Sequence, residues 1–270
     1  MSKPKILYIT QEVAPYLPDT EMSVLNKNLS QSIISHGYEV RTFMPKYGII
    51  NERRNQLHEV IRLSGMNIII DDTDHPLIIK VATLLPSRMQ VYFIDNDDYF
   101  MHHTAKDLEI RESAADNDER MMFFVRGAVE TVKKLKWAPA IIHCAGWATA
   151  LTPLYIKSQY REDPSFMEAK VVYSLFNDKF EGTLDERFLE KLKQDGFNED
   201  KMAAIKDGAV DYIALNKLAI DNSDAIVEAS EGIDQELIDY AVASGKPFMK
   251  YPGAEKYIDA YAEFYSSLQQ

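Results

Sequence analysis

Short apolar runs alternate with segments of helical periodicity over the first fifty residues. The run "KILYIT" (5–10) has the continuous apolar pattern of a buried strand. Apolar residues at helical spacing over 23–36 predict a helix that ends at Gly37. The run "YEVRTFMP" (38–45) predicts a second strand. Together these segments indicate an opening βαβ unit.

Residues 58–95 have a different pattern, with β-rich runs separated by turn signals, which predicts a meander or pair of hairpins. From Asn117 onwards, helical and strand patterns alternate again. Such alternation is typical of a parallel sheet covered by helices on both faces. We therefore predict one α/β domain over 1–270, a doubly wound Rossmann-like sheet with a β-rich insertion near 58–95. Beyond residue 100, strands are expected near 140–145, 170–176, 225–230 and 247–251, and helices near 117–136, 148–160, 184–194, 209–222, 233–244 and 254–267.

The composition limits which ligands the protein can attract and in which compartment we expect it. The net charge of −12 argues against general attraction to nucleic acid or to an anionic membrane. An anionic ligand would need a local cluster of basic groups or N–H donors. The one cysteine, Cys144, excludes an internal disulfide and fits a reducing compartment. Without a secretory pattern before the first strand or an apolar run of roughly 20 residues, we expect a cytoplasmic protein.

Two clusters of polar residues contain side chains that can bind metal ions. Asp95, Asp97 and Asp98 resemble a fragment of a calcium loop, but glycine at the sharp turn and a distal bidentate Glu are missing, which favours a solvated turn. His102 and His103 are adjacent, a spacing that rarely serves one metal ion, so a surface loop is the better interpretation. We predict no metal and no cofactor.

Several other features suit structural roles. His143 precedes Cys144 on an apolar strand, where a hydrogen-bonded core histidine is more common than a nucleophile pair. Asp116 with Glu119 three residues later predicts a helix N-cap of the capping-box type. The tyrosine-rich stretch 257–265 is expected to pack in the core, although an exposed aromatic stripe would indicate a partner surface.

Several motifs, in order, resemble the N-terminal half of bacterial glycogen synthases and plant starch synthases. They are "EVAPY", "HGYEVRTFMPKYG", "VYFIDNDDYF", "DNDERMMFFVRGAVE" and "PAIIHCAGWATALTPLYIK". The resemblance extends from about residue 5 to 180, and more weakly to about 230. It implies one half of a GT-B glycosyltransferase, in which two Rossmann-like domains face each other across a cleft. In that family the N-terminal domain mainly takes the acceptor glucan and the C-terminal domain holds most of the ADP-glucose donor.

The resemblance also implies what the chain has lost. Gln270 falls roughly where the family's first domain finishes, so we expect the C-terminal donor-binding domain to be absent. The family corner K-T-G-G-L-x-D-V, whose lysine and glycines meet donor phosphates, aligns with 18–25. Its lysine is replaced by Pro18 and its glycines by Thr20 and Glu21. Since proline has no N–H and Glu21 is anionic, we predict that this corner is not a phosphate site.

Other polar positions of the family cleft are also replaced. The H-D-W-H stretch aligns with Ala145, Gly146, Trp147 and Ala148, and the histidine of T-H-N aligns with Phe176. A retaining transferase needs polar groups there to stabilise charge in its transition state. We therefore assign no catalytic residue.

What remains is a candidate ligand-binding crevice of Glu12, Tyr16, Trp147 and Asn177. Trp147 suits two roles equally, stacking on a sugar or anchoring the following helix. The favoured function is an α-glucan-binding or regulatory module, inactive as a transferase by itself.

Two alternatives stay open. The first is an interaction protein that pairs with a full-length synthase or with itself, which an exposed apolar patch beside Trp147 and Phe176 would support. The second is an ADP-glucose-dependent transferase completed by a second chain that brings basic residues to the Pro18–Glu21 corner. The expected partners are thus an α-glucan or oligosaccharide and a protein partner or homo-oligomer, with no nucleic acid and no membrane.

Overall fold

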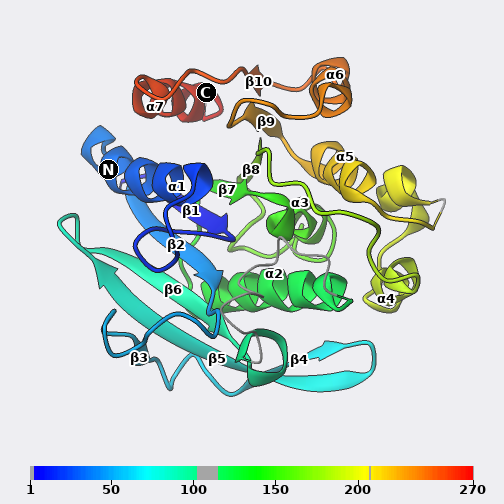
Figure 1. Ribbon diagram of the computed structural model, residues 1–270, viewed down its shortest axis with the longest axis horizontal. Helices are drawn as coiled ribbons and strands as arrows, with labels where there is room; N and C mark the ends of the chain where they lie inside the picture. The colour runs from blue at the N-terminus through cyan, green and yellow to red at the C-terminus, as the bar shows by residue number, and fades with distance from the viewer. Residues whose placement is uncertain (1–2, 102–114, 207, 270) are drawn as a thin grey trace.

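The computed structural model describes residues 3–101, 115–206 and 208–269. Within these residues ten strands form one sheet in the order β10-β9-β8-β7-β1-β2-β6-β5-β3, with β4 paired to β5 (Figure 1). The strands are β1 (Lys5–Thr10), β2 (Glu39–Pro45), β3 (His58–Glu59), β4 (Met66–Ile70), β5 (Thr73–Leu84), β6 (Met89–Asp95), β7 (Ile141–Ala145), β8 (Lys170–Leu175), β9 (Ala225–Glu228) and β10 (Phe248–Met249).

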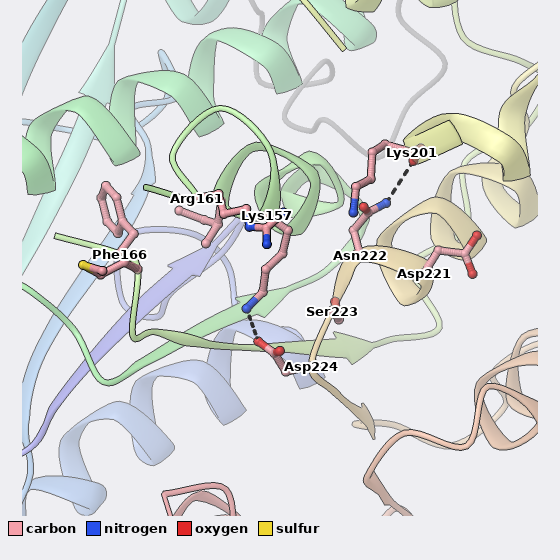
Figure 2. A pocket seen from close by; sticks show the side chains of 10 residues that line it. Lys157, Arg161, Phe166, Lys201, Asp221, Asn222, Ser223 and Asp224 are labelled. Atoms are coloured by element: carbon pink, nitrogen blue, oxygen red, sulfur yellow. Dashed lines mark hydrogen bonds and ion pairs between the residues drawn. The ribbon is translucent and has the colours of Figure 1, made fainter. Parts of the chain in front are cut away.

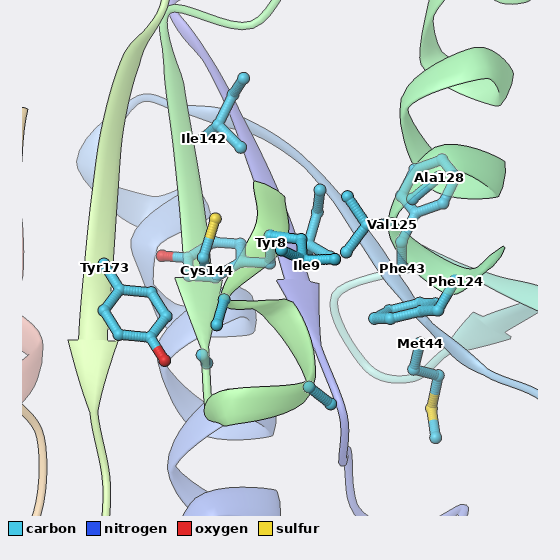
Figure 3. Packing of buried hydrophobic residues seen from close by; sticks show 14 of the residues in the cluster. Tyr8, Ile9, Phe43, Met44, Phe124, Val125, Ala128, Ile142, Cys144 and Tyr173 are labelled. Carbon is cyan, nitrogen blue, oxygen red and sulfur yellow. The ribbon is translucent and has the colours of Figure 1, made fainter. Parts of the chain in front are cut away.

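The strands from β10 to β6 run parallel, which confirms the predicted α/β fold class. β1 is central, with Ile9 opposite Phe43 of β2 and Cys144 of β7. All three side chains are buried, as expected for a parallel strand covered on both faces. Figure 3 shows this core, where Phe43 and Met44 of β2 lie beside Phe124 of α2 and Tyr173 of β8 lies on the far side of the strands from that helix.

The β-rich segment near 58–95 is continuous with the main sheet. β6 pairs in parallel with β2, and β5 then runs antiparallel to β6. β3 and β4 both pair with β5. The apolar pattern therefore predicted these strands, and the structure adds that they extend the Rossmann-like sheet at one edge.

The α-helices occupy the predicted positions, with small differences at their ends, whereas η2 and η4 were not predicted. α1 and α7 contact each other, whereas α2 contacts α3 and α3 contacts α5. The helices are α1 (Glu21–Ser32), α2 (Asn117–Lys134), α3 (Leu151–Lys157), α4 (Phe188–Gln194), α5 (Tyr212–Asn222), α6 (Gln235–Ala243) and α7 (Tyr257–Ser267). The short turns are the 3-10 helices η1 (Ile33–His36), η3 (Trp147–Thr149) and η4 (Glu199–Ile205), and the single π turn η2 (Asp97–Met101).

His143 is a hydrogen-bonded core residue, as predicted. Its Nε2 lies 3.1 Å from the Ser174 hydroxyl and its Nδ1 lies 2.7 Å from the Tyr265 hydroxyl. Tyr265 and Tyr261 of α7 have no exposed surface, which confirms core packing for these two, whereas Tyr257 and Phe264 are only partly buried. Complete burial lowers the pKa of His143 to about 3, so the imidazole is neutral near pH 7.

The predicted capping box at α2 is wrong. Asp116 occupies the N-cap position but makes no side-chain hydrogen bond to the helix backbone. Its carboxylate lies 3.2 Å from Nε of Arg120. Glu119 accepts a hydrogen bond from the Tyr99 hydroxyl and pairs with Lys191 at 2.7 Å. The Asp116 carboxylate is thus paired one turn along its own helix, and that of Glu119 is paired with a residue of α4.

The solvated-turn prediction is also wrong for Asp95. This residue is buried, and its carboxylate lies 2.8 Å from Nζ of Lys80. Asp98 is mostly exposed, with a contact of 3.4 Å to Nδ1 of His75. His102 and His103 lie outside the described residues. Among the helices that the structure describes, none has the length and apolar character that crossing a membrane requires.

Candidate functional site

The corner between β1 and α1 is held by a capping box at Thr20. The Thr20 hydroxyl accepts a hydrogen bond from the Ser23 N–H at 3.0 Å, and the Ser23 hydroxyl accepts one from the Thr20 N–H at 2.8 Å. Two N–H groups at this helix start are therefore bound internally. Glu21 supplies an acidic side chain in the first turn, which interacts favourably with the helix dipole.

The same threonine connects the corner to a buried carboxylate. Its hydroxyl donates a hydrogen bond of 2.6 Å to Oε2 of Glu12. Glu12 is buried directly after β1, so its side chain lies behind Thr20 and contributes a second acidic group at this corner. Thr20 thus forms hydrogen bonds on both sides of the helix start.

Asp178 lies deeper in the same region and was missed by the sequence interpretation. One carboxylate oxygen accepts a hydrogen bond of 3.0 Å from the Trp147 N–H, and the other accepts one of 2.9 Å from the Tyr212 hydroxyl. Burial raises the pKa of Asp178 to about 7, and the nearby charge of Glu12 acts in the same direction. The available signal was its place just after the apolar run 170–176, where parallel strands present ligand groups.

Gly146 is required by the close packing around Asp178. Its φ of +85° suits glycine, and a Cβ at this position would lie 2.7 Å from Oε1 of Gln11 and 2.9 Å from Oδ2 of Asp178. The same Gln11 oxygen accepts a hydrogen bond of 3.2 Å from the Ala148 N–H. The space at the end of β7 is thus filled by side chains from two neighbouring strand ends.

Most of the aromatic residues predicted for the crevice lie in the core. Trp147 has no exposed surface, and its ring packs 4.8 Å from that of Phe180. Tyr16 is almost fully buried against Phe93, and Phe176 is also buried. This placement favours the helix-anchor role of Trp147. Neither Trp147 nor Phe176 forms an exposed apolar patch. Ala145 and Ala148 are likewise buried.

Two cavities adjoin the corner, and Thr20 and Glu21 line both of them. The first, which we call the inner cavity, has a volume of about 290 Å³ and is lined by Thr20, Glu21, Met22, Phe176, Asn177, Asp178, Lys179 and Ser230. The second, which we call the tyrosine cavity, has a volume of about 390 Å³ and is lined by Asp19, Thr20, Glu21, Val24, Leu25, Asn28, Tyr251, Ala254 and Tyr257.

The tyrosine cavity is lined on one side by residues far away in the sequence. The Tyr251 hydroxyl donates a hydrogen bond of 3.3 Å to Oε1 of Glu21, across 230 positions. Tyr257, at the start of α7, lines the same cavity. Both rings are only partly buried, so each presents surface to the cavity. Sequence patterns alone offered no signal for this pairing.

Asn177 is exposed at the mouth of the inner cavity, as its candidate role requires. Its N–H donates a hydrogen bond of 2.8 Å to the Ser230 hydroxyl, which connects the ends of β8 and β9.

The other predicted corner residue, Pro18, contributes its carbonyl, which accepts a hydrogen bond of 3.2 Å from the Ser23 hydroxyl. Lys179 brings one cationic side chain to this cavity. In residues 3–101, 115–206 and 208–269, no three His, Cys, Asp or Glu side chains are grouped to hold a metal ion.

A parallel Rossmann-like sheet with cavities at the carboxyl ends of its strands defines an α/β protein that binds ligands at this edge, as each half of a GT-B glycosyltransferase does. Residues 5–247 match the family model of the starch synthase catalytic domain, and the chain belongs to that family. The catalytic domain of starch synthase IV from Arabidopsis thaliana, bound to ADP and acarbose, has a similar fold. The TM-score is 0.74 at 17% identity, and the match covers 93% of this chain and 51% of that one.

Curated relatives carry the name glycogen synthase. That of Chlorobium chlorochromatii is 37% identical over 192 residues, which are 71% of this chain and 39% of the relative. That of Chlorobium luteolum is 35% identical over 189 residues, with 70% and 39% covered. The matched region thus spans about two fifths of the length of these relatives.

Proposed function

We propose that this domain binds an α-glucan and has no glucosyltransferase activity by itself. The observation that carries the proposal is the corner at Thr20. There the capping box, the hydrogen bond to Glu12 and the side chain of Glu21 occupy the place where the family meets donor phosphates.

The negative charges at this corner disfavour binding of a nucleotide sugar, whose diphosphate is also negative. A diphosphate would approach the carboxylates of Glu21 and Glu12, and Pro18 has no N–H to donate. Lys179 is the cation that lines the inner cavity, and one flexible ammonium group cannot balance two carboxylates. The protein's net charge of −12 acts in the same direction.

The same groups suit a neutral, hydroxyl-rich ligand. Glu21 and Asn177 offer oxygen atoms that accept hydrogen bonds from sugar hydroxyls. Tyr251 and Tyr257 offer partly exposed rings on which the apolar face of a glucose unit can pack. Because the two cavities adjoin at Thr20 and Glu21, one linear glucan can occupy both. In this proposal the tyrosines take the stacking role that the sequence suggested for Trp147.

The regulatory part of the proposal follows from such binding. A domain that holds glucan without extending it can bring the polymer to an active synthase or withhold it from one.

Two measurements on the purified chain test the proposal. Co-sedimentation with glycogen should retain the protein, and soluble maltoheptaose should release it. Transfer of labelled glucose from ADP-glucose to glycogen should stay at the level of a protein-free control. Glucose incorporation by the chain alone would overturn the inactive assignment, and failure to co-sediment would overturn glucan binding.

A further inference from the structure

A third cavity lies at the opposite end of the strands and is larger than the inner cavity and the tyrosine cavity. Its volume is about 440 Å³ (Figure 2). Asp224 precedes β9, and Met167 lies shortly before β8, so the cavity is at the amino ends of these parallel strands. The glucan cavities lie at the opposite, carboxyl ends. This third cavity, which we call the basic cavity, is therefore separate from the proposed glucan site.

Three cationic side chains from separate elements line the basic cavity. Lys157 ends α3, Arg161 follows in the connection to β8, and Lys201 belongs to η4. Figure 2 shows all three around one space. Such a local basic cluster is what a protein of net charge −12 needs in order to hold an anion.

The acidic residues of this cavity are already engaged. The Asp224 carboxylate accepts a hydrogen bond from the Val171 N–H at 2.7 Å and lies 2.6 Å from Nζ of Lys157. The Asp221 carboxylate accepts one of 2.8 Å from the Tyr240 hydroxyl. Within the part of the chain that the structure describes, Arg161 and Lys201 form no ion pair, so their charges are available to a ligand.

A fourth cation strengthens the local field. Nζ of Lys246 donates hydrogen bonds of 2.6 Å to the carbonyls of Ile220 and Asp221, at the last turn of α5. Burial lowers the pKa of Lys246, the carboxylates of Asp221 and Asp224 act in the opposite direction, and the charges of Lys157 and Lys201 lower it further. Lys246 therefore lies close to this cluster and offsets the negative end of the α5 dipole there.

One wall of the basic cavity is apolar. The ring of Phe166 and the side chain of Met167 line it, and Met167 is 57% exposed. An exposed apolar group next to unpaired cations suits a ligand that carries both a charged and a non-polar part.

We propose that the basic cavity binds a small phosphate monoester. Arg161 and Lys201 bind the phosphate oxygens, Lys157 is held in place by Asp224, and the ester group packs on Phe166 and Met167. Arginine offers paired N–H donors to phosphate and lysine a concentrated charge. The ligand site is independent of glucan binding, because it shares no residue with the inner or tyrosine cavity.

The test uses phenyl phosphate as the probe, with inorganic phosphate and phenol for comparison. Methyl-labelled methionine should report binding by NMR, because Met167 lines the cavity while Met101, 53% exposed, lies elsewhere. We expect a saturable shift of the Met167 methyl signal with phenyl phosphate, a weaker affinity for inorganic phosphate, and no shift of Met101.

The double variant Arg161→Gln/Lys201→Gln should bind phenyl phosphate at least about tenfold more weakly, because two charge-assisted contacts are lost. The variant Arg62→Gln/Lys134→Gln removes the same charge from exposed positions elsewhere and should bind as the unmodified protein does. Absence of saturable binding, equal losses in both double variants, or equal shifts of the two methyl signals would overturn the proposal.

Discussion

The Thr20 hydroxyl lies 2.6 Å from Oε2 of Glu12 while it also accepts the Ser23 N–H at 3.0 Å. One side chain thus caps α1 and binds a buried carboxylate. A glycine at this position could form neither bond. The threonine side chain therefore determines the local structure of the helix start.

Replacing Thr20 with alanine tests this double role. Thr20→Ala should lower the free energy of unfolding by about 1–2 kcal/mol, because it removes an N-cap and a hydroxyl partner of Glu12. Thr20→Ser keeps the hydroxyl and should change stability by less than about 0.5 kcal/mol. Urea unfolding of the three proteins measures both effects. Similar losses in the alanine and serine variants would contradict the role of the hydroxyl.

Gly146→Ala should be strongly destabilising, because the added methyl group would meet Gln11 and Asp178 within 3 Å. Gly182 is a matched control with a positive φ of +78° and no atom within 4 Å of the added position. Both variants bear the cost of the left-handed backbone, and Gly146→Ala should cost about 1–3 kcal/mol more. Thermal or urea unfolding gives the difference. Equal stability of the two variants would show that the close approach has no energetic role.

Asp178 should make stability depend on pH. Its pKa is raised from 3.8 to about 7 in the folded protein, so the folded state binds the extra proton between these values. The stabilising contribution is complete below pH 3.8 and is lost as pH rises through 7. Asp178→Asn removes this dependence. The unmodified protein should therefore lose stability relative to the variant as pH rises. The difference in the free energy of unfolding, variant minus unmodified protein, should increase by roughly 1.4 kcal/mol per pH unit between pH 4 and 7.

His143 makes stability depend on pH in the opposite direction. Its contribution cancels when Asp178→Asn is compared with the unmodified protein. Its pKa is lowered to about 3, so below pH 6.5 only the unfolded state takes up the proton and stability falls as pH falls. Both proteins retain His143. Urea unfolding at several pH values measures the difference, and a value constant from pH 4 to 7 would contradict the assignment of Asp178.

Two substitutions of Tyr251 distinguish the contribution of its ring to glucan binding from that of its hydroxyl. Tyr251→Ala should weaken maltoheptaose binding roughly fivefold, because an aromatic platform contributes on the order of 1 kcal/mol. Tyr251→Phe keeps the ring and loses only the hydrogen bond to Glu21, so it should retain most of the affinity. Asn67→Ala, an exposed position on β4, serves as the control for unrelated substitution. Equal losses in the alanine and phenylalanine variants would assign the effect to the hydroxyl instead.

The sequence predicted the sheet and most helices because burial on both faces leaves a continuous apolar pattern in each strand, as in 5–10 and 170–176. It also predicted the core position of His143, since an apolar strand surrounds it. The capping box was predicted at Asp116 and occurs at Thr20, because the Asp116 carboxylate pairs with Arg120 of the same helix and that of Glu119 pairs with Lys191 of α4. The contact with Lys191 spans 72 positions, so the local pattern contains no information on it.

The site was less predictable for the same reason. Asn177 and the Pro18–Glu21 corner follow from their places at strand ends. The pairing of Tyr251 with Glu21 depends on how α7 returns to α1. The basic cavity likewise joins Lys157 with Asp224, which are 67 positions apart in sequence.

The most direct test of the central claim is a pair of calorimetric titrations of the purified chain, one with maltoheptaose and one with ADP-glucose. The acidic corner at Thr20 and Glu21 predicts saturable binding of maltoheptaose and no measurable heat of binding for ADP-glucose at millimolar concentration. Saturable binding of ADP-glucose that Lys179→Gln weakens, without binding of maltoheptaose, would show that the corner still accepts a phosphate and would contradict the account.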